Sequence, residues 1–160
     1  MRIICISDTH NQLSSIPIPA GDILIHAGDA TDLGTMREII KFNADLAKLT
    51  ARFQKCIFVP GNHDWLFQKD PSLAKGLLTN ATTLIDEELT FAGQSFYGSP
   101  WQPEFCNWAF NADKAKLRGV FSHIPSYTDI LITHGPPLNI IDGLNGRALG
   151  SDVLDRKSVV

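Results

Sequence analysis

Polar side chains of metal-ligand type follow four short apolar runs of the sequence. The runs are rich in Ile and typical of strands buried in a sheet. The side chains that follow them are Asp8 and His10, Asp29, Asn62 and His63, and His134. Asn and Asp are common wherever a backbone turns, so one such segment alone would indicate only a turn. Four coincident segments are hard to attribute to turns alone.

These four segments are expected to meet, because ligands of α/β sheets bind at the carboxyl ends of the strands. Their donors are oxygens and imidazoles without a thiolate, a set that selects divalent metals such as Mn, Fe, Zn or Ni. A carboxylate can bridge two cations, and two cations about 3.5–4 Å apart are a common device for attacking phosphate esters. The residues therefore indicate a metal centre for phosphoester chemistry.

The elements that position these residues follow from local patterns. Thr35 and Glu38 form a capping box that opens a helix reaching about Thr50. A helix from Trp65 to about Leu78 is expected to break at Pro71. The first apolar run, residues 2–7, is predicted to be a strand buried on both faces. Further strands are predicted at residues 22–27, 55–59 and 128–133. Further helices are predicted at residues 111–124 and 149–156.

The middle of the chain predicts a second sheet. Three short strand-like pieces with tight connections, read as an antiparallel meander, lie at residues 82–85, 89–92 and 95–98. An aromatic-rich loop follows at residues 99–110. Its simplest interpretation is a lid packed on the core, and the lesser alternative is a role in facing the substrate.

Composition limits the class of protein. The 160 residues, 44% of them hydrophobic, indicate one domain over residues 1–160. A net charge of −3 with no run of Lys and Arg argues against a nucleic-acid or membrane-surface protein. The apolar run at the N-terminus is too short for a signal peptide or a membrane span, so we expect a cytoplasmic protein. Cys5, Cys56 and Cys106 form no C-x-x-C pair and are interpreted as reduced, structural thiols.

The joint motif set resembles that of the calcineurin-like metallophosphoesterases. The matching pieces, in the order of that family, are Asp8-x-His10, Gly28-Asp29, Gly61-Asn62-His63-Asp64 and His134-Gly135. The surrounding segments resemble most closely the small MPPED-like branch. The resemblance covers nearly the whole chain and implies an α/β fold, a calcineurin-like two-sheet sandwich flanked by helices in four layers.

The same resemblance implies the ligands of two divalent metal ions, with Mn favoured among Mn, Fe, Zn and Ni. Asp8 and His10 would hold the first ion, and Asp29 would bridge both ions. Asn62 and His134 would hold the second ion.

The implied reaction is hydrolysis of a phosphomonoester or phosphodiester by a hydroxide bound at the two metals. His63 would bind no metal and would instead donate a proton to the leaving group or stabilise the transition state. Asp32 falls where some relatives carry a carboxylate that orients this His. The implied substrate is a small-molecule phosphoester, with a nucleotide as one candidate.

The sequence departs from the family at its end. The family's last motif is Gly-His-x-His, but no His follows His134. We therefore expect a fold truncated at its C-terminal side, with one imidazole lacking at each metal and an open sheet edge that a homodimer could cover. Three alternatives follow: a shortened form of an ordinary hydrolase, a weakened site completed by water, or a catalytically impaired domain that binds a nucleotide or protein partner. A metal-dependent amidase is a weaker alternative, since nothing indicates an acyl substrate.

Overall fold

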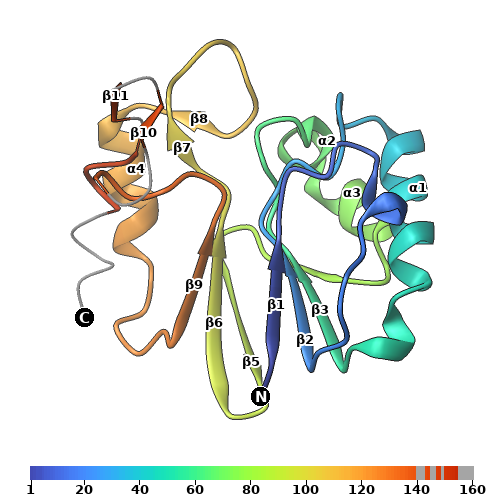
Figure 1. Ribbon diagram of the computed structural model, residues 1–160. Coiled ribbons are helices and arrows are strands. Elements are labelled where there is room, and N and C mark those ends of the chain that lie inside the picture. The colour runs from blue at the N-terminus through green and yellow to red at the C-terminus, as the bar shows by residue number, and fades with distance from the viewer. Residues whose placement is uncertain (140–142, 145–146, 149, 155–160) are drawn as a thin grey trace.

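The computed structural model describes residues 1–139, 143–144, 147–148 and 150–154. Two sheets stand side by side in the middle of the molecule, and helices cover their outer faces (Figure 1). The sequence prediction of a two-sheet α/β sandwich flanked by helices is confirmed.

The first sheet is parallel, with the strand order β1-β2-β3-β4. Its strands are β1 (Ile3–Ile6), β2 (Ile23–His26), β3 (Lys55–Phe58) and β4 (Thr82–Thr83). The helices beside it are α1 (Met36–Ala47), α2 (Trp65–Lys69) and α3 (Pro71–Leu77), with short 3-10 turns at Leu13–Ser15 and Thr50–Arg52. The parallel order explains why β1, β2 and β3 all end at the same edge.

The second sheet has the order β5-β6-β9. It contains β5 (Glu87–Phe91), β6 (Gln94–Ser99) and β9 (Ile130–Thr133), and α4 (Lys114–Ser122) lies outside it (Figure 1). Strand β6 pairs antiparallel with β5 and parallel with β9. Two small ribbons complete the described chain: β7 (Gln102–Pro103) with β8 (Asn111–Ala112), and β10 (Gly143–Leu144) with β11 (Arg147–Ala148).

Three hydrophobic clusters separate the four layers. The cluster between the sheets joins Ile25 and Ile57 of the first sheet to Phe96 of the second. Alternate residues of the same strands point the other way, so Leu24 and Phe58 pack with the helices of the first sheet. The third cluster contains Tyr97, Leu117, Phe121 and Ile124 and lies between the second sheet and α4.

Two strand predictions need correction. The first run was expected to be buried on both faces, but β1 is the edge strand of its sheet, and Cys5 is exposed. The piece that begins at Thr82 was expected in an antiparallel meander, but it pairs parallel with β3 in the first sheet. The second sheet takes β9 as its third strand instead. All three cysteines are free, but Cys106 is also exposed, and only Cys56 is buried.

The predicted helices are present with shifted ends. The capping box of Thr35 and Glu38 opens α1, and Pro71 separates α2 from α3. The helix expected from Asn111 begins only after Asp113, which accepts a hydrogen bond from the Lys116 N–H. Residues 150–154 form a bend, a bridge and a turn, and the rest of the helix predicted at 149–156 lies outside the described residues. Within the described part of the chain, no helix has the length and apolar character needed to cross a membrane.

Candidate metal centre

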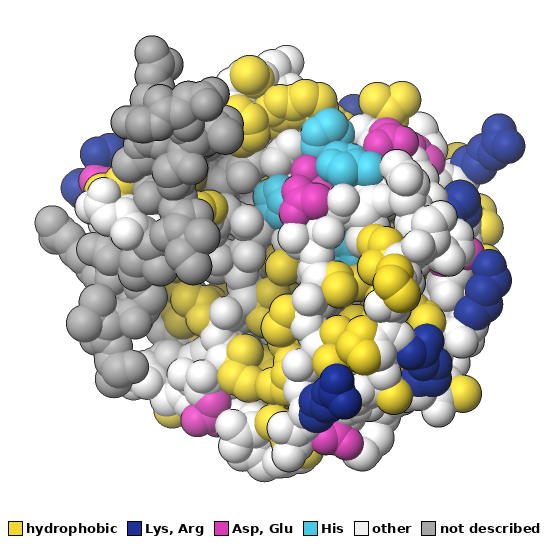
Figure 2. Space-filling model, viewed as in Figure 1, with side chains coloured by type: hydrophobic (Ala, Val, Ile, Leu, Met, Phe, Trp, Pro, Cys, Tyr) yellow, Lys and Arg dark blue, Asp and Glu magenta, His cyan; other side chains and the backbone are white. Residues whose placement is uncertain are grey.

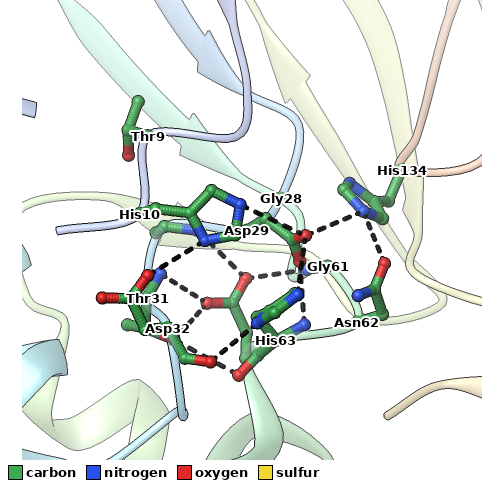
Figure 3. Close-up of polar contacts among 12 residues, drawn as sticks. Thr9, His10, Gly28, Asp29, Thr31, Asp32, Gly61, Asn62, His63 and His134 are labelled. Atoms are coloured by element: carbon green, nitrogen blue, oxygen red, sulfur yellow. Dashed lines mark hydrogen bonds and ion pairs between the residues drawn. The ribbon is translucent and has the colours of Figure 1, made fainter. Parts of the chain in front are cut away.

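The carboxyl ends of β1, β2, β3 and β9 meet at one end of the two sheets. The segments that follow these strands bring together the side chains singled out in the sequence: Asp8, His10, Asp29, Asn62, His63 and His134. Figure 3 shows most of this group, with Asp29 in the middle and imidazoles around it. The convergence expected from the strand ends is therefore present.

Asp29 is the centre of the cluster. Its side chain is buried, and its Oδ2 lies 3.9 Å from Nε2 of His10, 4.0 Å from Nε2 of His63 and 3.5 Å from Nε2 of His134. Its Oδ1 accepts the N–H of His63 at 2.8 Å. One buried carboxylate thus faces three imidazoles.

Two groups of possible metal ligands share Asp29. One contains His10, Asp29 and His63, and the other contains Asp8, Asp29 and His134; within each group the ligand atoms lie within 4.8 Å of one another. A carboxylate common to two groups could bridge a pair of cations. The grouping differs from the division implied by the resemblance, since it sets His63 beside His10 and Asp8 beside His134.

Asn62 and His134 lie together, as the predicted second metal requires. Nδ1 of His134 is 2.8 Å from the carbonyl oxygen of Ala27, which can only accept, so Nδ1 carries a proton. Nε2 of His134 faces Asn62 Oδ1 at 3.0 Å and Asp29 Oδ2. The imidazole is therefore held with its Nε2 directed into the cluster.

The electrostatics of the cluster favour a positive charge next to Asp29. Burial lowers the pKa of His134, but the hydrogen bond and the charge of Asp29 raise it by more, to about 9. Burial raises the pKa of Asp29, and the imidazoles, His134 first, bring it below its usual value. Without a cation, a proton on His134 balances this carboxylate. The donor set and its charge fit a divalent cation, which would take the place of that proton.

His63 contacts Asp32, but not the Asp32 carboxylate that was predicted to orient it. Nδ1–H of His63 donates to the main-chain carbonyl of Asp32 at 2.7 Å. The Asp32 carboxylate points elsewhere: its Oδ1 is 3.2 Å from Nδ1 of His10, and its Oδ2 accepts from Asn11. Asp32 can orient His63, but it does so with its backbone.

The backbone of the cluster is unusual at its ligand positions. Asp8, His10 and Asp29 have φ of 54°, 39° and 54°, in the left-handed region that L residues seldom adopt. A Cβ at Gly61 would overlap with the Asp29 carboxylate, and one at Gly28 would press on His134. Glycine is required at both turns because the segments after β2, β3 and β9 pack directly against one another.

Sequence reasoning gave no role to Asp64, which ties two of these segments together. It is fully buried and accepts the Gly61 N–H at 2.8 Å. It also accepts the Thr31 N–H at 3.1 Å and the Thr31 hydroxyl at 2.7 Å. Its place in the Gly-Asn-His-Asp motif was the available signal, but only the fold shows which donors it meets.

His26 supports the cluster without being part of it. The Gly28 N–H donates to its Nδ1 at 3.3 Å, so Nε2 carries the proton that Thr9 Oγ1 accepts at 2.9 Å. Burial lowers its pKa to about 3, so this imidazole is neutral. His26 joins the segment after β1 to the segment after β2 without reaching the ligand atoms.

Comparisons with known proteins give a family match and several relatives. A family model described as calcineurin-like phosphoesterase matches residues 1–157. Metallophosphoesterase domain-containing protein 1 of Homo sapiens and that of Mus musculus are each 41% identical over 165 residues, which cover 88% of this chain and 50% of theirs. The UPF0046 protein K07C11.7 of Caenorhabditis elegans is 37% identical over 157 residues, covering 89% of this chain and 53% of its own. The chain spans about half the length of these curated relatives.

Proposed function

Because the chain belongs to the calcineurin-like phosphoesterase family, we propose that it hydrolyses a small phosphoester with divalent cations bound at the candidate metal centre. The observation that carries this proposal is the buried Asp29 carboxylate, shared by two groups of ligand atoms and faced by three imidazoles. The proposed ligands of two cations, with Mn favoured over Fe, Zn and Ni, are Asp8, His10, Asp29, Asn62 and His134. Such cations lower the pKa of a bound water and neutralise charge on phosphoryl oxygens.

His63 is the proposed proton donor to the leaving group. Its Nδ1 is occupied by the Asp32 carbonyl, so Nε2 is the nitrogen that faces Asp29. A positioned imidazole of this kind contributes roughly 10²–10⁴-fold to a reaction that needs proton transfer. His63 would then act on the substrate, while its neighbour Asn62 acts on a cation.

The proposal is tested by turnover of p-nitrophenyl phosphate esters in the presence of Mn. We expect Asp29→Ala to abolish turnover, because both ligand groups lose their common carboxylate. We expect His63→Ala to lower kcat by roughly 10²-fold or more on an ester with a poor leaving group such as phenol, and by less on the p-nitrophenyl esters. His123→Ala is the matched control, since His123 is exposed at the end of α4. Absence of divalent metal binding at high micromolar concentration would refute the proposal.

Three finer predictions accompany this proposal. A nucleotide is a candidate substrate, or the ligand of a catalytically impaired domain; calorimetry with mononucleotides, combined with ester turnover, separates these cases. A homodimer that covers the open sheet edge expected at the C-terminal side is the second prediction. The cytoplasmic location stays a prediction from the sequence.

A further inference from the structure

The loop between β7 and β8 reaches the candidate metal centre. It is residues 104–110 of the predicted aromatic-rich loop, and it arches at the end of the molecule where β1, β2 and β3 finish (Figure 1). The indole ring of Trp108 lies on the imidazole of His63, with 4.2 Å between ring centroids and 33° between ring planes. Trp108 therefore covers a face of the proposed proton donor.

The stack is held in place by the backbone. The N–H of Ala109, next to Trp108, donates to the carbonyl oxygen of Asn62, next to His63, at 3.1 Å. The N–H of Phe110 donates to Oε1 of Gln68 at 2.8 Å. Ala109 and Phe110 are both buried, so the loop is anchored directly beside Trp108. The two stacked rings thus come from segments that are hydrogen-bonded to each other.

Three contacts together define the orientation of the His63 ring. The Asp32 carbonyl accepts from Nδ1, and His10 meets the ring edge to face at 4.8 Å between centroids, with an interplanar angle of 89°. Trp108 supplies the third contact. The His63 side chain is 24% exposed, so a face left open would let solvent and other rotamers compete.

We propose that Trp108 is a positioning residue that holds the His63 imidazole with Nε2 directed at the leaving group. This inference rests on the function proposed above for His63. The proposed role differs from a purely structural role because its effect depends on the leaving group. A leaving group that departs without help does not need the proton, so loss of Trp108 should matter only when the leaving group is poor.

The test compares two aryl esters that differ only in the leaving group, the p-nitrophenyl and phenyl forms of one phosphate ester. Phenolate resembles a Tyr side chain, with a pKa of about 10, and benefits from protonation as it departs. p-Nitrophenolate is far less basic. We expect Trp108→Ala to lower kcat on the phenyl ester roughly 10-fold or more and kcat on the p-nitrophenyl ester much less, because a displaced catalytic group loses up to about 10²-fold.

Trp108→Phe, which keeps an aromatic face, should restore most of the rate on the phenyl ester. Phe105→Ala is the control within the same loop, because Phe105 is 49% exposed and its ring is outside the stack. It should leave both rates unchanged. Equal losses on both esters for Trp108→Ala, or no loss on either, would overturn the proposal.

A second readout does not depend on turnover. At fixed pH, the ring current of Trp108 shifts the His63 carbon-bound proton resonances upfield in the NMR spectrum. Trp108→Ala should move them downfield, and Phe105→Ala should not. Unmoved His63 resonances in Trp108→Ala would refute the stack itself. A wild-type chain that turns over neither ester, but shows the expected shifts, would refute the proposed function while leaving the stack established.

Discussion

Asp64 shows how one buried residue holds the ligand segments together. Its carboxylate accepts hydrogen bonds from Gly61 and Thr31, which belong to the turns after β3 and β2. Burial raises its pKa, and these hydrogen bonds work in the opposite direction. The hydrogen bonds described at this carboxylate all come from N–H or hydroxyl donors, so a side chain that only accepts fits this position.

The residue-scale prediction concerns Asp64→Asn. An amide offers one acceptor oxygen and one NH₂, and the NH₂ would face an N–H or a hydroxyl in either orientation. We expect the free energy of unfolding to fall by about 1–3 kcal/mol, the cost of unsatisfied buried donors. Urea unfolding of the wild type and of Asp64→Asn measures this difference in the free energy of unfolding.

Asp113→Asn is the matched control for Asp64→Asn. Asp113 caps α4, and Asn caps a helix about as well as Asp, so the control should change stability little. Equal stability of the two variants would contradict the role given to Asp64.

The sequence predicted which residues would meet at the site, because strand ends of a parallel sheet converge. It did not predict the Asp32 contact, because the choice between carboxylate and main-chain carbonyl depends on loop conformation. It also did not predict the stacking of Trp108 on His63. That contact joins loops 45 positions apart (108 − 63), which no local pattern records.

At the scale of elements, the first turn of α1 supports the site as well as the helix. Glu38 accepts from the Thr35 N–H at 2.8 Å, completing the capping box. Its Oε1 also accepts from the Asn11 side chain and from the N–H of Asp32. Burial raises the pKa of Glu38, but these hydrogen bonds lower it by more, to about 2.

The prediction for this element is a pH-dependent difference between the wild type and Glu38→Gln. The Glu38 pKa falls from 4.5 to about 2 on folding, so its carboxylate stabilises the fold above about pH 4.5. That stabilisation is lost as the pH falls towards 2. At neutral pH we expect Glu38→Gln to cost about 1–3 kcal/mol, the usual contribution of hydrogen bonds to a charged group.

Urea unfolding of both forms between pH 7 and pH 3 tests the capping prediction. Glu104→Gln, at an exposed position, is the control and should change stability by less than about 0.5 kcal/mol. A Glu38→Gln difference that stays constant across this range would show that the carboxylate charge is not what stabilises the turn.

Helices and strands could be predicted where a local sequence signal specifies them. The capping box and Pro71 are local signals, and both predictions were confirmed. The position of β1 at an edge and the pairing of β4 with β3 depend on strand order. Apolar runs do not specify strand order, so β1 was wrongly expected to be buried on both faces.

For the whole molecule, the candidate metal centre joins the two sheets. His134 follows β9 of the second sheet, while Asp8, Asp29 and Asn62 follow strands of the first. On the face shown in Figure 2, His side chains and an acidic side chain lie next to one another in one patch in its upper part. A cation bound there would have ligands from both sheets, so binding should stabilise their contact.

The whole-molecule prediction is that Mn raises the melting temperature of the chain. At a free Mn concentration 100 times the Kd, binding contributes about 2.7 kcal/mol. For a chain of this size each kcal/mol corresponds to about 2–4 °C, so we expect a rise of roughly 5–10 °C. His134→Ala should remove about half of the rise or more at the same Mn concentration, because loss of a direct ligand weakens binding at least about 10–100-fold.

His123→Ala, the same substitution at an exposed position outside the cluster, should keep the full rise. Hydrogen exchange gives the spatial part of the test. If the cation connects the sheets, Mn should slow amide exchange in β9 and in β2 together, and His134→Ala should suppress both effects. If Mn protects β2 alone, or raises the melting temperature of His134→Ala as much as that of the wild type, the ligands come from the first sheet only. His134 would then contribute to the fold through its ion pair with Asp29 instead.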